Sequence, residues 1–203
     1  MRRMSVTIPV ALVAGAVLLV VGWKAATLLN WNPHHRVGEP IDRLNGVAVF
    51  YNGGVDHSSG RNLAPDGYNL GIRYQCVEFV KRYYYERLNH KMPDAYGHGK
   101  DFFQAGLPDG TRNTQRDLRQ FVNGSPTKPH PDDLLVFGPW LVNRYGHVAI
   151  ISAVGDSAVE IVQQNAGPFR PSRESIPLRF EQGQWKLQKR RVLGWLRKVT
   201  DNP

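Results

Sequence analysis

Cysteine is almost absent from this chain, which has 203 residues and a single cysteine, Cys76. One thiol can form neither an intramolecular disulfide nor a tetrahedral thiolate metal site. It can be a buried apolar group, form an intermolecular bridge, or act as a nucleophile. Internal repeats and low-complexity tracts are absent as well. Beyond the N-terminal segment, the length suits one domain with its own core.

Acidic side chains are also scarce: 17 stand against 26 Lys and Arg, for a formal net charge of +9. Such a basic surface favours anionic neighbours such as phospholipid headgroups, acidic wall polymers or nucleic acid. No zinc-finger, helix-turn-helix or aromatic RNA-binding motif accompanies the charge, so we expect no nucleic-acid partner. The plainer interpretation is a solvated strand pair, with basic residues clustered at Lys186, Lys189, Arg190, Arg191, Arg197 and Lys198.

Charge is missing altogether from Ser5 to Trp23. A helix of about 19 residues is roughly 28 Å long, close to the hydrocarbon thickness of about 30 Å. Arg2 and Arg3 favour a cytoplasmic N-terminus. We therefore predict a cytoplasmic stretch at 1–4 and a transmembrane signal anchor at 5–23. A cleaved secretory signal is the alternative, but Lys24 disfavours the local Ala25-Ala26 cleavage site.

This anchor predicts a single-pass protein of the cell membrane, with its main domain periplasmic or on the outer face. Residues 24–40 are rich in Asn, Pro, His and Gly and are typical of a linker. Residues 41–200 then form the domain. Its pattern predicts helices first and a meandering antiparallel sheet after them, an α+β fold. The expected helices follow Cys76 and cover 101–104 and 115–122, and the expected strands cover 47–51, 134–137, 147–153, 158–163 and 192–197.

Cys76 stands where a loop is expected to turn into an amphipathic helix. Peptide dipoles at the first helical turn favour a thiolate over a thiol. Among seven histidines, His147 differs because it opens an apolar strand, where an imidazole is held in place. If the next hairpin is symmetric about Gly155-Asp156, Gln163 faces His147 and can accept a hydrogen bond from it.

Several short motifs appear in an order that resembles one known family. They are Asn45-Gly46-Val47-Ala48-Val49-Phe50, Gln75-Cys76-Val77-Glu78-Phe79, Asn123-Gly124-Ser125-Pro126, Asp133-Leu134-Leu135-Val136-Phe137, Gly146-His147-Val148-Ala149-Ile150-Ile151, Gln163-Gln164-Asn165 and Leu193-Gly194-Trp195. The set resembles CHAP, the cysteine, histidine-dependent amidohydrolases and peptidases. It is especially similar to the amidase domain of glutathionylspermidine synthetase/amidase.

The resemblance implies a papain-like fold in which Cys76 is the nucleophile and His147 the general base and acid. It also implies an oxyanion hole that includes the Cys76 N–H, helped by Gln75. Separately, we expect no cofactor and no metal. The chain departs from the family at Gln163, where a glutamate is usual. The residue that orients the imidazole is therefore Gln163 or Asn165, with Gln163 favoured.

Two substrate classes remain open for a thiol amidase of this kind. An exported domain points to peptidoglycan stem peptides or cross-bridges, and the resemblance points to a glutathionyl–polyamine amide. A third hypothesis, from another functional class, is an inactive CHAP scaffold that serves as a binding module of the cell envelope. A histidine metal site is not expected, because the histidines lack zinc-like spacing.

Overall fold

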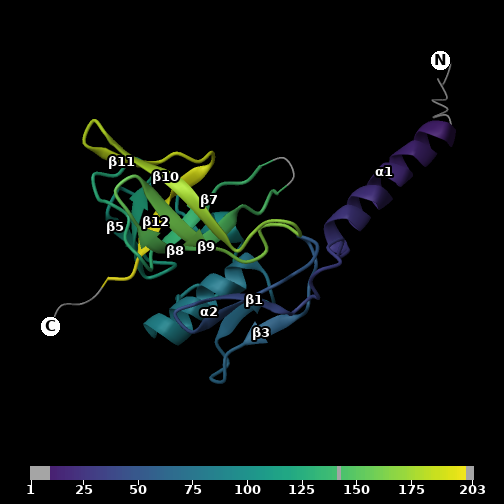
Figure 1. Ribbon diagram of the computed structural model, residues 1–203, viewed down its shortest axis with the longest axis horizontal. Helices are drawn as coiled ribbons and strands as arrows, with labels where there is room; N and C mark the ends of the chain where they lie inside the picture. Colours follow the sequence, from purple (N-terminus) through teal and green to yellow (C-terminus); the bar gives the residue numbers. More distant parts are fainter. Residues whose placement is uncertain (1–9, 141–142, 200–203) are drawn as a thin grey trace, which may run out of the picture.

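The body of the protein is an antiparallel sheet of eight strands (Figure 1). The computed structural model describes residues 10–140 and 143–199. Along the sheet the strand order is β11-β10-β9-β8-β7-β12-β6-β5, so the last strand in the chain, β12, lies inside the sheet, between β7 and β6. The strands are β5 (Thr111–Asn113), β6 (Leu118–Val122), β7 (Leu134–Phe137), β8 (His147–Val154), β9 (Ala158–Val162), β10 (Arg173–Glu181), β11 (Gln184–Leu187) and β12 (Val192–Arg197).

The sheet curls so far that its edge strand β11 meets the segment that follows β6, near the opposite edge. An isolated bridge joins Ser125 to Trp185 there, and the Trp185 N–H donates to the Ser125 carbonyl over 2.8 Å. Apolar side chains from the strands fill the inside of the curl, and burying them drives the closure. They include Phe121, Leu135, Ile151, Ile161, Ile176, Leu187 and Trp195.

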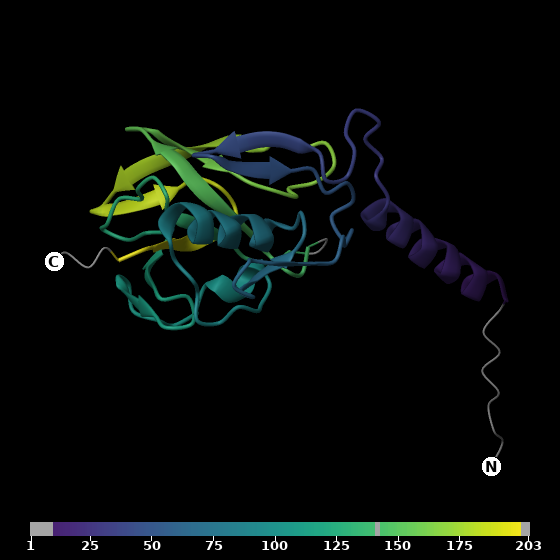
Figure 2. The same cartoon turned by 90° about the horizontal axis from the view of Figure 1, so that it is seen from below.

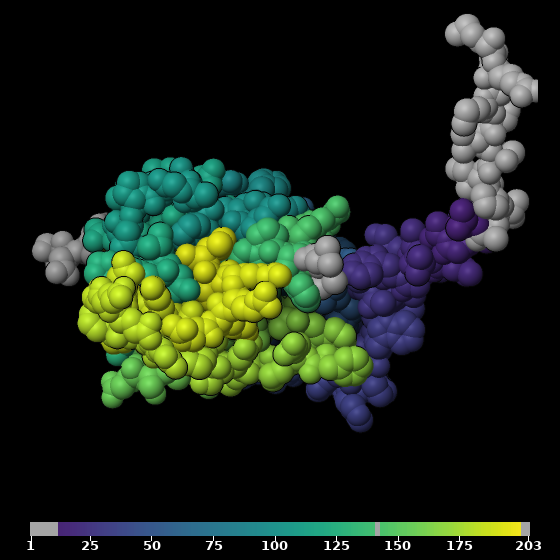
Figure 3. Space-filling model, turned by 90° about the horizontal axis from the view of Figure 1, so that it is seen from above, coloured from purple at the N-terminus to yellow at the C-terminus, as the bar shows by residue number. Residues whose placement is uncertain are grey.

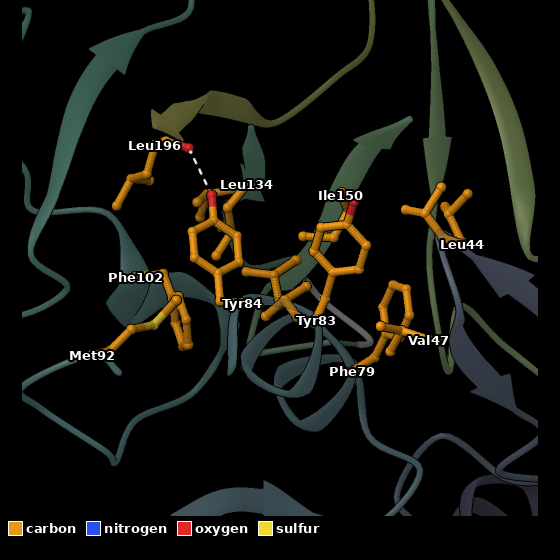
Figure 4. Close-up of a cluster of buried hydrophobic side chains, with 14 of the residues drawn as sticks. Leu44, Val47, Phe79, Tyr83, Tyr84, Met92, Phe102, Leu134, Ile150 and Leu196 are labelled. Carbon is orange, nitrogen blue, oxygen red and sulfur yellow. Dashed lines mark hydrogen bonds between the residues drawn. The ribbon is translucent and has the colours of Figure 1, made fainter. Parts of the chain in front are cut away.

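Helix α2 (Cys76–Leu88) lies against the other face of the sheet (Figure 2). Phe79, Tyr83 and Tyr84 are fully buried, and Figure 4 shows Tyr84 beside Leu134 and Leu196, Tyr83 beside Ile150, and Phe79 beside Val47. The Tyr84 hydroxyl also donates to the Leu196 carbonyl over 3.3 Å. Two small hairpins complete this side, β1 (Pro40–Leu44) with β2 (Val47–Phe50) and β3 (Arg61–Leu63) with β4 (Asn69–Ile72).

Helix α1 (Val10–Leu28) projects from one end of the body (Figures 1 and 3). Its C-terminal end and the residues after it are attached to two loops. The Asp56 N–H donates to the Thr27 carbonyl over 2.9 Å, and the Asn32 amide donates to the Pro168 carbonyl over 2.9 Å. The predicted linker at 24–40 thus makes specific contacts with the body, although its role as a domain boundary stays a prediction.

The membrane predictions need correction. Across the part of the chain that the structure describes, no helix has both the length and the apolar character needed to span a bilayer. The described helix begins at Val10 and contains Lys24, so its uncharged part of about 14 residues reaches only about 21 Å. The transmembrane anchor at 5–23 and the single-pass location that depended on it are therefore wrong. Residues 1–9, with the predicted cytoplasmic stretch at 1–4, lie outside the described residues.

The predicted fold class is also wrong in its helix content. The described residues hold two α-helices, α1 and α2, and one 3₁₀ turn, η1 (Gly99–Phe102). Residues 115–122, expected as a helix, contain strand β6, whose Leu118 and Gln120 are buried while Arg119 is exposed. β6 pairs with both β5 and β12. Pairing on both sides therefore outweighs the local helical pattern.

Candidate active site

Cys76 is the first residue of α2. Tyr74 has a φ of 68° and Gln75 is extended, so the chain enters the helix through a sharp turn. The first helical hydrogen bond runs from the Phe79 N–H to the Gln75 carbonyl. The N–H groups of residues 76–78 precede it and have no helical acceptor. The half-buried thiol therefore lies among free backbone donors.

His147 is the first residue of β8 and is half-buried. Two glycines allow the backbone to pass close to it. A Cβ at Gly146, whose φ is +70°, would lie 2.6 Å from the Phe137 carbonyl oxygen, and a Cβ at Gly99 would lie 2.9 Å from the His147 nitrogen. Both glycines are therefore needed for the tight approach of η1 and β7 to the start of β8.

The helix start and the strand start meet at the sulfur. The backbone N–H of Val148, the residue after His147, lies near enough to the Cys76 sulfur to lower the pKa of the thiol. On the far side of the imidazole, His147 Nε2 lies 3.0 Å from Gln163 Oε1. An amide oxygen only accepts, so Nε2 carries the proton. Nδ1 is then the unprotonated nitrogen, available to take a proton from a thiol.

The pKa directions describe a neutral pair. Burial raises the pKa of the Cys76 thiol, while the N–H groups of Val148, Val77 and Cys76 act to lower it. Burial lowers the pKa of His147 to about 4, against the opposing effect of the Gln163 hydrogen bond. Both directions favour the uncharged forms, a thiol at Cys76 and a neutral imidazole at His147. This differs from the thiolate that the helix position alone suggested, because desolvation outweighs the backbone N–H groups.

The three residues 163–165 have separate roles. Only Gln163 contacts His147. Gln164 is almost fully buried and ties the helix start to the β2 hairpin: it accepts from the Phe50 N–H and donates to the Gln75 carbonyl and to Glu78. The Asn165 amide donates to Gln75 Oε1 over 2.6 Å and to the Val55 carbonyl over 2.9 Å. Asn165 therefore lies on the helix side of the site, and Gln163 on the imidazole side.

Gln75 was the predicted side-chain donor of the oxyanion hole. Its amide nitrogen donates to the His57 carbonyl over 2.7 Å and to the Val55 carbonyl over 3.3 Å. Both amide protons are thus used to hold the loop at residues 55–57. The free donors beside the sulfur are backbone N–H groups, which suits the predicted part of Cys76 in that hole.

The predicted contact between His147 and Gln163 is present, but the register of the β8–β9 hairpin differs from the predicted one. The ladder pairs Ile150 with Val162 and Val154 with Val159, with an irregularity between Ile151 and Ala153. The symmetric register that would place Gln163 directly opposite His147 is therefore wrong. β9 ends at Val162, and Gln163 reaches the imidazole from the residue just beyond the strand.

Two charged residues near Gln163, namely Glu174 and Lys189, were not identified from the sequence. The Gln163 amide nitrogen is 3.4 Å from Glu174 Oε2, and Glu174 forms an ion pair with Lys189. The β9–β10 register that positions them pairs Glu174 with Ile161. The alternating pattern of residues 173–181 was the available signal for strand β10. Among the described residues, no cluster of His, Cys, Asp or Glu is arranged to hold a metal ion.

Comparison with known proteins agrees with this geometry. A family model described as the CHAP domain matches residues 65–165, a span that contains Cys76, His147 and Gln163. This match covers the segment that joins the start of α2 to the start of β8 and defines the class of domain. The chain belongs to the CHAP family.

The relatives carry the same domain within longer proteins. Trypanothione synthetase of Crithidia fasciculata is 34% identical over 140 residues, 68% of this chain and 22% of that protein. Glutathionylspermidine synthase of the same organism is 29% identical over 202 residues, 82% of this chain and 28% of that protein. The bifunctional glutathionylspermidine synthetase/amidase of Escherichia coli K12 is 26% identical over 156 residues, 72% of this chain and 25% of that protein. The chain thus spans roughly a quarter of these relatives' length.

Proposed function

We propose that this protein hydrolyses an amide bond through an acyl-enzyme on Cys76, with His147 as general base and acid. The observation that carries the proposal is the position of the sulfur. The thiol stands at the start of α2 and is influenced by the N–H of Val148, the residue that follows His147, whose Nε2 is already engaged by Gln163. One nitrogen of His147 is therefore oriented and the other is free for chemistry.

Because Cys76 and His147 are both uncharged at rest, proton transfer accompanies the attack of the sulfur instead of preceding it. As the Cys76 sulfur attacks the amide carbonyl carbon, His147 Nδ1 takes the thiol proton, and the backbone N–H at the start of α2 stabilises the oxyanion. The C–N bond then breaks, the amine leaves with the proton from His147, and a thioester remains. Water attacks the thioester with His147 again as base, which releases the acid and restores the thiol.

For the substrate we propose a peptide–polyamine amide of the glutathionylspermidine type. The amidase named among the relatives supports this class. The competing class, peptidoglycan peptides, was favoured by an exported location, which the predicted anchor no longer supports.

The test is incubation of the full chain with glutathionylspermidine and, separately, with purified peptidoglycan, followed by mass spectrometry of the products. We expect glutathione and spermidine in equal amounts from the first incubation, and none with Cys76→Ala. Release of peptides from peptidoglycan alone would replace the proposed substrate class. Equal cleavage by the Cys76→Ala variant would overturn the mechanism.

The neutral pair also favours a second candidate, a binding module with an unreactive thiol. A thiol with a raised pKa and an imidazole with a pKa of about 4 form little thiolate at neutral pH. An experiment with substrate distinguishes the enzyme from the binding module. A Cys76 thioester trapped by acid quenching during turnover supports the enzyme, and binding of the conjugate without thioester or product supports the module.

A further inference from the structure

The Gln163 amide can be placed in two ways, and they have opposite consequences for His147. With its oxygen toward Nε2, the imidazole must donate from Nε2 and keeps Nδ1 free as a base. With its NH₂ group toward Nε2, the imidazole must accept there and carries its proton on Nδ1. The second arrangement leaves no base facing Cys76. The group that fixes the orientation of the Gln163 amide therefore determines whether His147 can act as the base for Cys76.

Two groups face the other end of this amide. The Gln163 nitrogen lies 3.4 Å from the Pro171 carbonyl oxygen and 3.4 Å from Glu174 Oε2. A carbonyl and a carboxylate can only accept, so both require the NH₂ end of Gln163. Only 5% of Gln163 is exposed, so water cannot readily replace a lost partner.

Glu174 is itself held in place. Lys189 forms an ion pair with it, and the Lys189 ammonium also lies 5.3 Å from the centre of the Phe137 ring. Phe137 in turn packs beside His147, with ring centres 5.9 Å apart. The carboxylate, the ammonium and the aromatic ring thus surround the Gln163–His147 pair. Glu174 and Lys189 both lie beyond the segment that matches the family model.

We propose that Glu174 is a positioning residue that acts through Gln163: its carboxylate keeps the amide oxygen on Nε2 of His147 and so keeps Nδ1 free to accept the Cys76 proton. The inference rests on the proposed function for its consequence in catalysis. Its structural part, the choice of imidazole tautomer, stands independently of any substrate.

The first test reads the tautomer without turnover. Long-range ¹H–¹⁵N spectra of the full chain with labelled histidine report which nitrogen of His147 carries the proton, and the His147→Ala spectrum assigns the signal. We expect the Nε2–H form alone in the wild type. In Glu174→Gln, whose side chain can also donate to Gln163, we expect a measurable share of the Nδ1–H form. Glu181→Gln is the matched control, because Glu181 lies on the same strand and is exposed.

The second test reads turnover. We expect Glu174→Gln to lower kcat about fivefold with KM within about twofold, and Glu181→Gln to change neither. In Gln163→Glu/Glu174→Gln the residue at 163 can only accept, so the tautomer no longer depends on position 174 and activity returns to within about twofold of wild type.

The outcomes separate the two proposals. An unchanged tautomer in Glu174→Gln, or a kcat loss that persists in the double variant, would overturn the role of Glu174 even if hydrolysis by Cys76 is intact. Conversely, a tautomer shift in a protein that cleaves neither substrate would leave the positioning role intact and reject the proposed reaction.

Discussion

The two halves of the site are built from different kinds of contact. On the sheet side, His147 is oriented by a side-chain series that runs through Gln163 and Glu174 to Lys189. On the helix side, side-chain amides bind mostly backbone groups: Gln75 holds the Val55 and His57 carbonyls, and Gln164 holds the Phe50 N–H and the Gln75 carbonyl.

The difference teaches what each half contributes. Side-chain series can choose a proton position, because carboxylates, amides and ammonium groups differ in what they donate and accept. Contacts with backbone groups instead fix the path of the chain, and here they fix the turn that presents Cys76. Substitutions on the sheet side should therefore change proton transfer, and substitutions on the helix side should change stability unless they remove the sulfur itself.

The largest expected effect is the loss of that sulfur. Cys76→Ser replaces the thiol with a hydroxyl that a base of low pKa activates poorly. We expect kcat to fall at least about 1,000-fold. Circular dichroism and the urea midpoint should match wild type, since the two side chains are similar in size. Activity within tenfold of wild type would contradict the assignment of Cys76 as nucleophile.

Removal of the imidazole comes next. His147→Ala takes away the proposed base and should lower kcat by about 10²- to 10⁴-fold. Iodoacetamide should still modify Cys76 in this variant at high pH, because the thiol remains. A single-turnover assay that shows unchanged thioester formation would contradict the role of His147 in the first step.

The residues that bear chemistry were predictable where the sequence signal is local. The strands at 134–137 and 192–197 were predicted with the bounds the structure gives, because each is a short apolar run between turn residues. The helix that starts at Cys76 was predicted for a similar reason, since its apolar positions recur along one face. The His147–Gln163 contact was expected too, although through the wrong register.

The features that could not be predicted from the sequence depend on contacts between distant segments. Residues 115–122 carry a helix-like pattern, and only pairing with both β5 and β12 makes them a strand. The raised pKa of Cys76 follows from burial under the sheet, which no local pattern reports. Glu174 and Lys189 meet Gln163 only after β10 folds back on β9.

A stability comparison sharpens the contrast between the two halves. Gln164→Ala leaves the Phe50 N–H and the Gln75 carbonyl without their side-chain partner, and we expect it to lower the free energy of unfolding by about 2–4 kcal/mol. Gln163→Ala removes the hydrogen bond to the imidazole and two longer contacts of 3.4 Å, with the Pro171 carbonyl and Glu174, and should cost about 1–2 kcal/mol. Urea unfolding of the two variants measures both values. Equal losses would show that the halves do not differ in this way.

The smallest expected effect is a shift in pH dependence. His147 must be neutral to act as a base, and its pKa is about 4. The acid limb of kcat/KM should therefore lie near pH 4, with activity lost as pH falls through that value. Gln163→Glu/Glu174→Gln moves one negative charge next to Nε2 at constant net charge.

A nearby carboxylate favours the imidazolium, so the pKa of His147 should rise and the acid limb should move up by about one pH unit. The same change favours the thiolate–imidazolium pair, so alkylation of Cys76 by iodoacetamide near pH 6 should become faster than in the wild type. Profiles of kcat/KM between pH 3.5 and 8, with Glu181→Gln as control, measure the shift. A limb that moves down, or slower alkylation, would mean that residue 163 does not control the charge on His147.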